Sequence, residues 1–297
     1  MNRYNKLILV RTLEQKFPFY KKLTFGMYKR ILTLFLSPFA LCRFIKARKS
    51  FFMPYAEIAL TERCSLRCLN CANLMPYYDS PQHNPFENII KDVEALEKVV
   101  CELSICQLLG GEPFIYPQIK EVLDLLNAKA FIKHIQIVTN GTVLPPENIT
   151  EQLKNKKVTV HISDYGDKSF RLHELITLFD KEGICFEIIG YSNWIDYGDL
   201  SDKGFTDEEI KQSYKTCATA ECKTLFKGYL YTCPRSAHMA NLGILVNNAD
   251  RISIDGHLTK QKLIDFYNKV MVSACGHCEL TKRRKQIPPA FQCVKEN

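Results

Sequence analysis

From Tyr55 onward, short apolar runs alternate with longer amphipathic stretches, and this alternation limits the fold more than any other feature of the sequence. Successive strand–helix units of this kind form a parallel sheet covered by helices, so the fold class predicted is α/β. We expect strands near 55–61, 104–109, 134–139, 158–163 and 184–189. We expect helices between them near 86–101, 117–129, 147–154 and 170–182.

Each predicted strand is followed by a polar or glycine-rich turn. In barrel-like α/β folds these turns gather at the C-terminal edge of the sheet, where ligands bind. The turns begin at Thr61, Gly110, Thr139, Ser163 and Gly190. The chemistry of the protein is therefore expected along one rim.

The alternation is lost after about residue 195. A helix predicted near 206–215 leads into a cysteine-rich segment with a hairpin signal over 225–232, where Gly228 suits the turn. We therefore predict a core over 51–195 and a small, cysteine-rich C-terminal domain over 196–297.

Residues 1–50 carry most of the net charge of +8. They hold 12 of the 40 Lys and Arg residues and one of the 32 acids, which leaves 28 basic and 31 acidic residues in the rest. A near-neutral body argues against a nucleic-acid partner. The apolar run 31–42 is shorter than the roughly twenty residues of a membrane span. This basic extension could lie on an anionic membrane surface or pack on the main domain, and both alternatives stay open.

The N-terminal residues show no readable signal peptide, so we expect a cytoplasmic protein, with peripheral contact to the inner face of the membrane as one alternative. Disulfides are rare in a reducing compartment. Some of the 13 cysteines are therefore expected to bind metal.

Three cysteines, Cys64, Cys68 and Cys71, lie on one loop directly after the first predicted strand. Thiolates at this spacing can hold a single iron–sulfur cubane. The next cysteine, Cys101, falls in a predicted helix, so one iron is left open, as in catalytic metal sites. The alternative is structural zinc, but no fourth ligand at zinc-finger spacing precedes His83.

This loop resembles the signature of the radical SAM superfamily, C-x-x-x-C-x-x-C after the first strand, and the resemblance extends over about 55–192. It implies a partial (β/α)6 TIM-like barrel. In that family a Gly-Gly-Glu-Pro stretch binds the amino group of S-adenosylmethionine. Here the stretch is Gly110, Gly111, Glu112 and Pro113.

The later turns match the family as well. By the resemblance, Asn140 and its neighbours Thr139 and Gly141 should border the cofactor, and Ser163 and Asp164 should lie near its ribose. One departure is Asn70, because the family usually has an aromatic residue just before the third cysteine.

The resemblance implies a [4Fe-4S] cluster whose open iron binds S-adenosylmethionine. One electron then cleaves the sulfonium, and a 5′-deoxyadenosyl radical abstracts hydrogen from a substrate. The electron donor would be a protein such as flavodoxin or ferredoxin.

The C-terminal cysteines resemble the start of the SPASM or twitch domains of this family, which hold auxiliary four-iron clusters. We expect one auxiliary [4Fe-4S] cluster, with a zinc knuckle as the alternative because the two sites share ligands. The sequence does not decide between Cys217 and Cys222 as ligands. The candidate ligands are Cys217, Cys222, Cys233, Cys275 and Cys278.

The remaining cysteines are not among the candidate ligands. Cys42, Cys101, Cys106 and Cys185 lie in apolar runs and are predicted to be buried. Cys293 could be a spare thiol or a hydrogen-atom donor. Three polar residues near predicted loops, Tyr191, Arg235 and His238, are expected on the surface.

The predicted activity is a radical SAM oxidation or epimerisation of a sugar-like molecule or a glycan precursor. The absence of a readable peptide-recognition domain in residues 1–50 favours a small substrate. A peptide- or protein-modifying enzyme is the alternative within the family. A non-catalytic iron–sulfur or zinc module that binds a partner at the membrane is the alternative of another class.

Overall fold

The structure is a computed structural model that describes residues 51–293. The predictions for the basic extension 1–50, for its membrane contact and for Cys42 lie outside the described residues.

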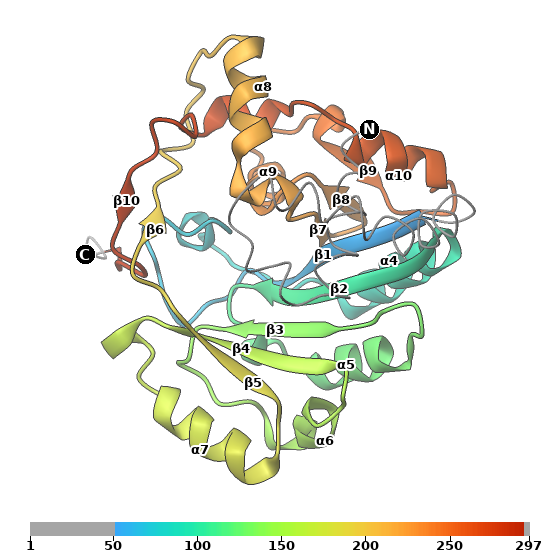
Figure 1. Ribbon diagram of the computed structural model, residues 1–297, viewed down its shortest axis with the longest axis vertical. Helices are drawn as coiled ribbons and strands as arrows, with labels where there is room; N and C mark the ends of the chain where they lie inside the picture. The colour runs from blue at the N-terminus through green and yellow to red at the C-terminus, as the bar shows by residue number, and fades with distance from the viewer. Residues whose placement is uncertain (1–50, 294–297) are drawn as a thin grey trace, which may run out of the picture.

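An eight-stranded sheet forms the centre of the molecule, in the order β5-β4-β3-β2-β1-β7-β8-β9 (Figure 1). The first five strands along the chain are β1 (Phe51–Thr61), β2 (Val100–Gly110), β3 (Ile135–Thr139), β4 (Val158–Asp164) and β5 (Phe186–Gly190). They run parallel to one another. This mostly parallel sheet confirms the predicted α/β class.

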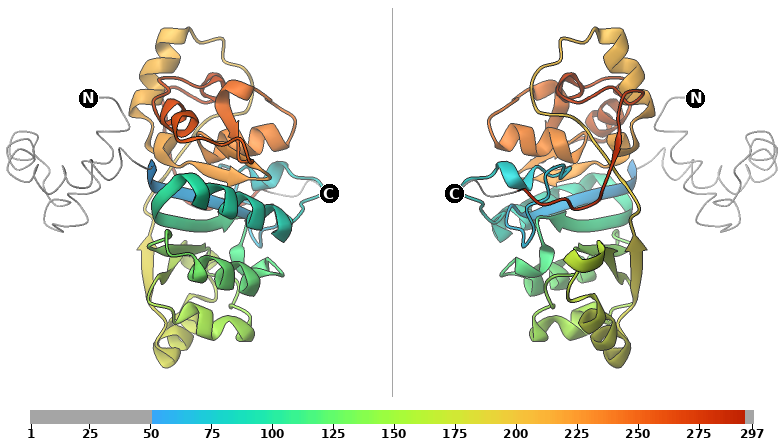
Figure 2. Two further views of the ribbon diagram at one scale, coloured as in Figure 1. Left: turned by 90° about the vertical axis from the view of Figure 1, so that its right-hand side faces the viewer. Right: turned by 90° about the vertical axis from the view of Figure 1, so that its left-hand side faces the viewer.

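Four helices connect these parallel strands and pack on the sheet (Figures 1 and 2). They are α4 (Phe86–Val99), α5 (Ile119–Ala128), α6 (Thr150–Leu153) and α7 (Leu172–Glu182). In α5 the buried residues are Ile119, Val122, Leu123 and Leu126. Because this spacing puts one apolar stripe on the helix, α5 buries that stripe against the strands.

The C-terminal part of the chain extends the same sheet beyond β1. Strand β7 (Thr224–Phe226) pairs with β1 in parallel, and β8 (Tyr229–Tyr231) and β9 (Arg251–Ser253) follow antiparallel. Lys227 and Gly228 both have positive φ, as the two central residues of a type I′ hairpin turn require. The hairpin prediction is therefore confirmed, and the domain boundary at 195 stays a prediction.

Further elements complete this part of the chain. They are α8 (Asp207–Thr216), α9 (Pro234–Asn241), α10 (Lys260–Tyr267) and the antiparallel pair β6 (Trp194–Ile195) and β10 (Gln286–Ile287). The pair β6–β10 lies at the left edge of the view in Figure 1, away from β7, β8 and β9. A capping box between Thr206 and Glu209 begins α8. No helix among residues 51–293 is long and apolar enough to cross a membrane.

Two strand boundaries differ from the prediction. Strand β1 begins at Phe51 although Pro54 lies inside it, because β7 pairs with β1 only from Glu57 onward and the ring of Pro54 displaces no hydrogen bond to β7. Helix α4 ends at Val99, so Cys101 lies in β2, not in a helix.

Candidate functional site

A cavity of about 290 Å³ lies where the parallel strands end, and we call it the first cavity. Its wall includes the thiol-bearing residues Cys64, Cys68 and Cys71. The turns after β2, β3 and β4 contribute Gly110, Gly111, Thr139, Asn140 and Ser163. The sheet therefore brings the three cysteines to the turns that the sequence placed on one rim. Four predicted cofactor residues are not part of the lining: Glu112, Pro113, Gly141 and Asp164.

The two glycines of the turn after β2 allow two loops to approach closely. A Cβ on Gly111 would lie 1.9 Å from the carbonyl oxygen of Arg63, and one on Gly110 would lie 2.4 Å from that of Thr61. The backbone N–H of Gly111 donates to the Thr61 carbonyl at 2.7 Å. The glycines therefore seat this turn against the start of the cysteine loop, residues 64–71, in addition to bordering the cavity.

Glu112 is fully buried and links two turns. Its carboxylate accepts hydrogen bonds from the backbone N–H of Asn140 at 2.9 Å and of Phe114 at 3.2 Å. Burial raises the pKa of Glu112 to about 7. These contacts orient the carboxylate within the turn, and its contact with the cofactor stays a prediction.

Asn140 reaches from the turn after β3 to the cysteine loop. Its side-chain amide donates to the hydroxyl of Ser65 at 3.0 Å and to the sulfur of Cys64 at 3.5 Å. Asp164, by contrast, accepts from the backbone N–H of Gly166 at 2.9 Å. This contact is that of an ordinary turn.

The cysteine loop is also held by residues from near the end of the described chain. The backbone N–H of Leu69 donates to the Phe291 carbonyl, and that of Cys293 donates to the Arg67 carbonyl, both at 2.7 Å. The amide of Gln292 donates to the sulfur of Cys68 at 3.3 Å. No sequence motif indicated this contact, because the partners are 224 positions apart. Cys293 does not line the first cavity.

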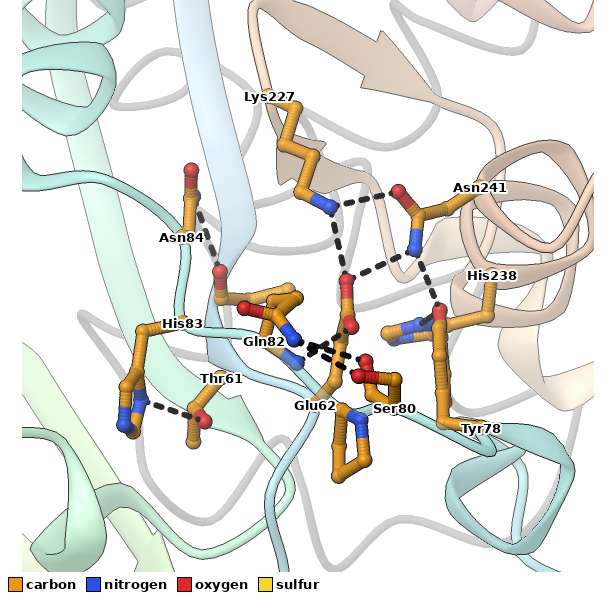
Figure 3. A network of polar contacts seen from close by, with 12 residues as sticks. Thr61, Glu62, Tyr78, Ser80, Gln82, His83, Asn84, Lys227, His238 and Asn241 are labelled. Carbon is orange, nitrogen blue, oxygen red and sulfur yellow. Dashed lines mark hydrogen bonds and ion pairs between the residues drawn. The ribbon is translucent and has the colours of Figure 1, made fainter.

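A buried polar network fixes the residues that precede the cysteine loop (Figure 3). Glu62, which is 3% exposed, pairs with Lys227 of the hairpin turn at 2.8 Å and accepts from Asn241 of α9 at 2.8 Å. Asn241 also donates to the hydroxyl of Tyr78, which contacts Nδ1 of His238 at 2.7 Å. The network joins β1, the hairpin and α9 into one support.

His238 is 1% exposed, so its predicted surface position is wrong. It lies on α9 against the ring of Phe226, with the two ring centroids 5.3 Å apart. Burial, aided by the charge of Lys227, lowers the pKa of His238 to about 3. The imidazole is therefore neutral at physiological pH.

Three aromatic rings form one side of the first cavity. Tyr165 lies 5.5 Å from Tyr191 and 5.4 Å from Trp194, measured between ring centroids. Tyr191 is 39% exposed and lines the cavity, so its predicted exposure is confirmed in part. Asn70, at the position where the family has an aromatic residue, donates to Asp196 at 2.9 Å.

A buried carboxylate that the sequence analysis missed also lines this cavity. Glu57 lies in the middle of β1, is 4% exposed, and accepts from the hydroxyls of Tyr55 and Thr224, both at 2.9 Å. Burial raises its pKa. The only sequence signal was a single acid inside an apolar strand. Cys222 lies beside Glu57 and lines the same cavity.

The other four C-terminal cysteines line a separate, smaller cavity, which we call the second cavity. They are Cys217, Cys233, Cys275 and Cys278. Arg235 and Arg284 border it as well. Arg235 is 5% exposed and lies on α9, so its predicted surface position is wrong.

The thiols of the second cavity differ in their ionisation. Burial raises the pKa of Cys233 to about 12. Burial also acts to raise the pKa of Cys217, but hydrogen bonds from Thr219 and Arg284 and the charge of Arg284 lower it below the usual value. Cys217 therefore ionises more readily than Cys233, and metal ligands must be deprotonated.

The cysteines that were predicted to be buried differ in their exposure. Cys106 is fully buried and Cys101 is half-buried. Cys185 is exposed, which contradicts the prediction, because it lies just before the edge strand β5. Among the residues that the structure describes, no three or more His, Cys, Asp or Glu side chains are arranged to hold a single metal ion.

The region around the first cavity is similar to known proteins. Residues 58–176 match the profile of the Radical SAM superfamily. The chain is 26% identical to GTP 3′,8-cyclase of Aquifex aeolicus (strain VF5) over 163 residues, which are 52% of this chain and 49% of the cyclase. It is 31% identical to the antilisterial bacteriocin subtilosin biosynthesis protein AlbA of Bacillus subtilis (strain 168) over 118 residues, 38% of this chain and 25% of AlbA. The chain thus spans about half or less of the length of these relatives.

Two solved structures share the fold. Native anSMEcpe with bound AdoMet superposes with a TM-score of 0.51 at 14% identity, over 71% of this chain and 80% of that chain. BtrN in complex with AdoMet and 2-DOIA superposes with a TM-score of 0.50 at 12% identity, over 82% of this chain and 100% of that chain. These radical SAM neighbours are consistent with a partial TIM-like barrel.

Proposed function

Because residues 58–176 of this chain carry a radical SAM domain, we propose that the protein reductively cleaves S-adenosylmethionine at the first cavity and uses the resulting radical to oxidise or epimerise a small polar substrate. The observation that carries the proposal is the meeting of Cys64, Cys68 and Cys71 with the turns after β2, β3 and β4 around one cavity.

The donor set of the first cavity fits a four-iron cluster with one open position. The loop supplies three thiols, and iron–sulfur clusters are held by Cys thiolates. Asn140 and Gln292 donate to the sulfurs of Cys64 and Cys68, and such hydrogen bonds orient metal ligands. When bound, the cluster and S-adenosylmethionine would supply a 5′-deoxyadenosyl radical for hydrogen abstraction.

The chain's own residues would position the cofactor. The turns with Gly110, Gly111 and Asn140 border the cavity beside the three thiols. Ser163, at the end of β4, would lie along the ribose side. A flavodoxin or ferredoxin would deliver the electron that the cleavage consumes.

Other residues that line the first cavity support a small polar substrate. Tyr165, Tyr191 and Trp194 offer ring faces, and Glu57 of β1 offers a buried carboxylate. Apolar rings with a few placed polar groups are typical of small-molecule sites. We therefore propose a sugar-like molecule or glycan precursor as the substrate class.

A peptide substrate is the second candidate, and the similarity to the bacteriocin biosynthesis protein AlbA over 118 residues favours it. Reductive turnover with each substrate class in turn separates the two candidates, because only the class that the protein accepts should increase the formation of 5′-deoxyadenosine.

The second cavity supports an auxiliary [4Fe-4S] cluster held by Cys217, Cys233, Cys275 and Cys278. Residues with four thiols line one cavity, with no histidine or carboxylate in its lining. Soft thiolate sets of this kind select iron–sulfur clusters or zinc. Metal and acid-labile sulfide analysis after reconstitution distinguishes these two occupants.

The test of the activity is anaerobic reconstitution, reduction with dithionite and detection of 5′-deoxyadenosine. Cys64→Ala should abolish the product and lower the iron content. Cys185→Ala is the matched control, because this thiol is exposed and lines neither cavity. A fully loaded protein that does not bind S-adenosylmethionine would instead support the non-catalytic module.

A further inference from the structure

Two arginines from distant parts of the chain donate directly to thiols of the second cavity. Nε of Arg235 lies 3.2 Å from the sulfur of Cys278, and a terminal nitrogen of Arg284 lies 3.2 Å from that of Cys217. Arg235 is 5% exposed. Two of the four thiols thus each receive a charge-assisted hydrogen bond, roughly twice as strong as a neutral one.

Other contacts hold both guanidinium groups in place. Arg235 also donates to the carbonyl of Gly198 at 3.3 Å, and Arg284 donates to that of Glu279 at 2.9 Å. The ring of Tyr197 packs against both, with its centroid 5.4 Å from the guanidinium carbon of Arg235 and 4.7 Å from that of Arg284. The two cations are therefore fixed parts of the cavity wall.

Neither guanidinium forms an ion pair with an Asp or Glu among the described residues. Arg235 is buried and Arg284 is half-buried, and a cation withdrawn from water without a negative partner is destabilising. The thiols are the only anionic groups that the second cavity offers, so the cavity is built for an occupant that keeps them ionised.

The charge of a four-iron cluster in the second cavity would determine the direction in which the two arginines shift its reduction potential. Four thiolates around an oxidised four-iron core of charge +2 give a net charge of −2, which two guanidinium groups balance. Reduction by one electron takes the net charge to −3. Positive charge and hydrogen bonds at the sulfurs favour the more negative state, and both are known determinants of cluster potential.

We propose that Arg235 and Arg284 raise the reduction potential of the auxiliary cluster, so that it accepts the electron released when a substrate radical is oxidised. This inference rests on the auxiliary cluster of the proposed function. The step balances for a carbinol substrate: the C–H hydrogen atom goes to the 5′-deoxyadenosyl radical, and the remaining carbon radical becomes a carbonyl by losing one proton to water and one electron to the cluster. The protein thus oxidises its substrate, whereas an epimerase needs no net electron acceptor.

The test is a potentiometric EPR titration of the reconstituted full chain. The signal of the auxiliary cluster is the one that added S-adenosylmethionine leaves unchanged. For Arg235→Gln and for Arg284→Gln we expect the equilibrium constant for reduction to fall at least tenfold, a shift of about 59 mV to lower potential for one electron. Arg283→Gln is the matched control, because Arg283 packs on Phe205 and contacts no thiol.

The outcomes separate this inference from the proposed function. Unchanged potentials in both loaded glutamine variants would overturn the role of the arginines, while formation of 5′-deoxyadenosine would persist. A wild-type protein that makes 5′-deoxyadenosine but holds zinc in the second cavity would overturn the auxiliary cluster and this inference together. If the glutamine variants fail to load iron, Arg235→Lys and Arg284→Lys keep the charge, and a potential more than about 59 mV below wild type in these loaded variants would refute the charge argument.

Discussion

Replacement of Gly111 by alanine tests the close approach on which the first cavity depends. The added Cβ would lie 1.9 Å from the carbonyl oxygen of Arg63, whereas Cβ atoms come no nearer than about 3.0 Å to such atoms. One of the two loops must therefore move by more than about 1 Å. The obstacle is backbone, so rotation of a side chain gives no relief.

The expected cost follows from the contacts that this shift breaks. The backbone hydrogen bonds from Gly111 to Thr61 and from Glu112 to Arg63, at 2.7 and 2.9 Å, contribute about 1 kcal/mol each. Overpacking adds about 1–3 kcal/mol. We expect Gly111→Ala to lower the free energy of unfolding of the apoprotein by about 3–5 kcal/mol. The first cluster should also load poorly, since Cys64 follows Arg63 directly.

Urea denaturation of the anaerobic apoprotein and iron analysis after reconstitution measure the two effects. Gly190→Ala is the control, because a Cβ there meets nothing within 4 Å, and its change should stay within about 1 kcal/mol. A Gly111→Ala protein that is as stable as the Gly190→Ala protein and loads iron normally would refute the argument.

Three further predictions concern other parts of the site. Lys227→Met should lower the free energy of unfolding, measured by urea denaturation, by about 2 kcal/mol, because buried Glu62 loses its cation. Lys120→Met breaks the exposed pair with Asp124 at the same 2.8 Å and should lower it by less than about 0.5 kcal/mol. Equal losses of stability would contradict the importance of burial. His238→Asn should reduce the acid sensitivity of folding: the folded pKa of His238 is about 3 and the unfolded value is about 6.5, so its neutral form stabilises the protein above pH 6.5 and this contribution is lost as the pH falls. Between pH 7.5 and 5.0 the stability difference between the two proteins should change by about 2 kcal/mol, and a constant difference would contradict the assignment. Cys222→Ser should leave the iron content unchanged while Cys233→Ser lowers it, and a loss of iron in the Cys222 variant would place Cys222 among the cluster ligands.

The core of the fold could be predicted because its signals are local. Helices α4, α5 and α7 each show their own apolar periodicity, the strands between them are short apolar runs, and the turns collect the predicted residues at one edge. The start of β1 was missed because Pro54 normally ends a strand, and only the position of β7 shows why it does not.

The functions of the C-terminal cysteines depend on long-range packing and local helix geometry. Cys217 and Cys222 flank a short 3-10 helix, Ala218–Glu221, and at three residues per turn they face different directions. One therefore lines the second cavity and the other the first. Glu57 was missed and Arg235 was predicted on the surface for a related reason: a single charged residue is visible in the sequence, but the cavity that it lines is not.

The hydrogen bonds of Gln292 to Arg67 and Cys68 limit the order in which the protein can mature. Arg67 and Gln292 are 225 positions apart, so the ribosome has released the cysteine loop long before it makes the segment that holds it. Metal delivered to the nascent chain before that would meet three thiols without these hydrogen bonds. Stable insertion of a metal centre is thus expected only after the segment around Gln292 has been made. A bulky fusion placed directly behind residue 293 should interfere with a site whose Cys68 lies 224 positions before Gln292.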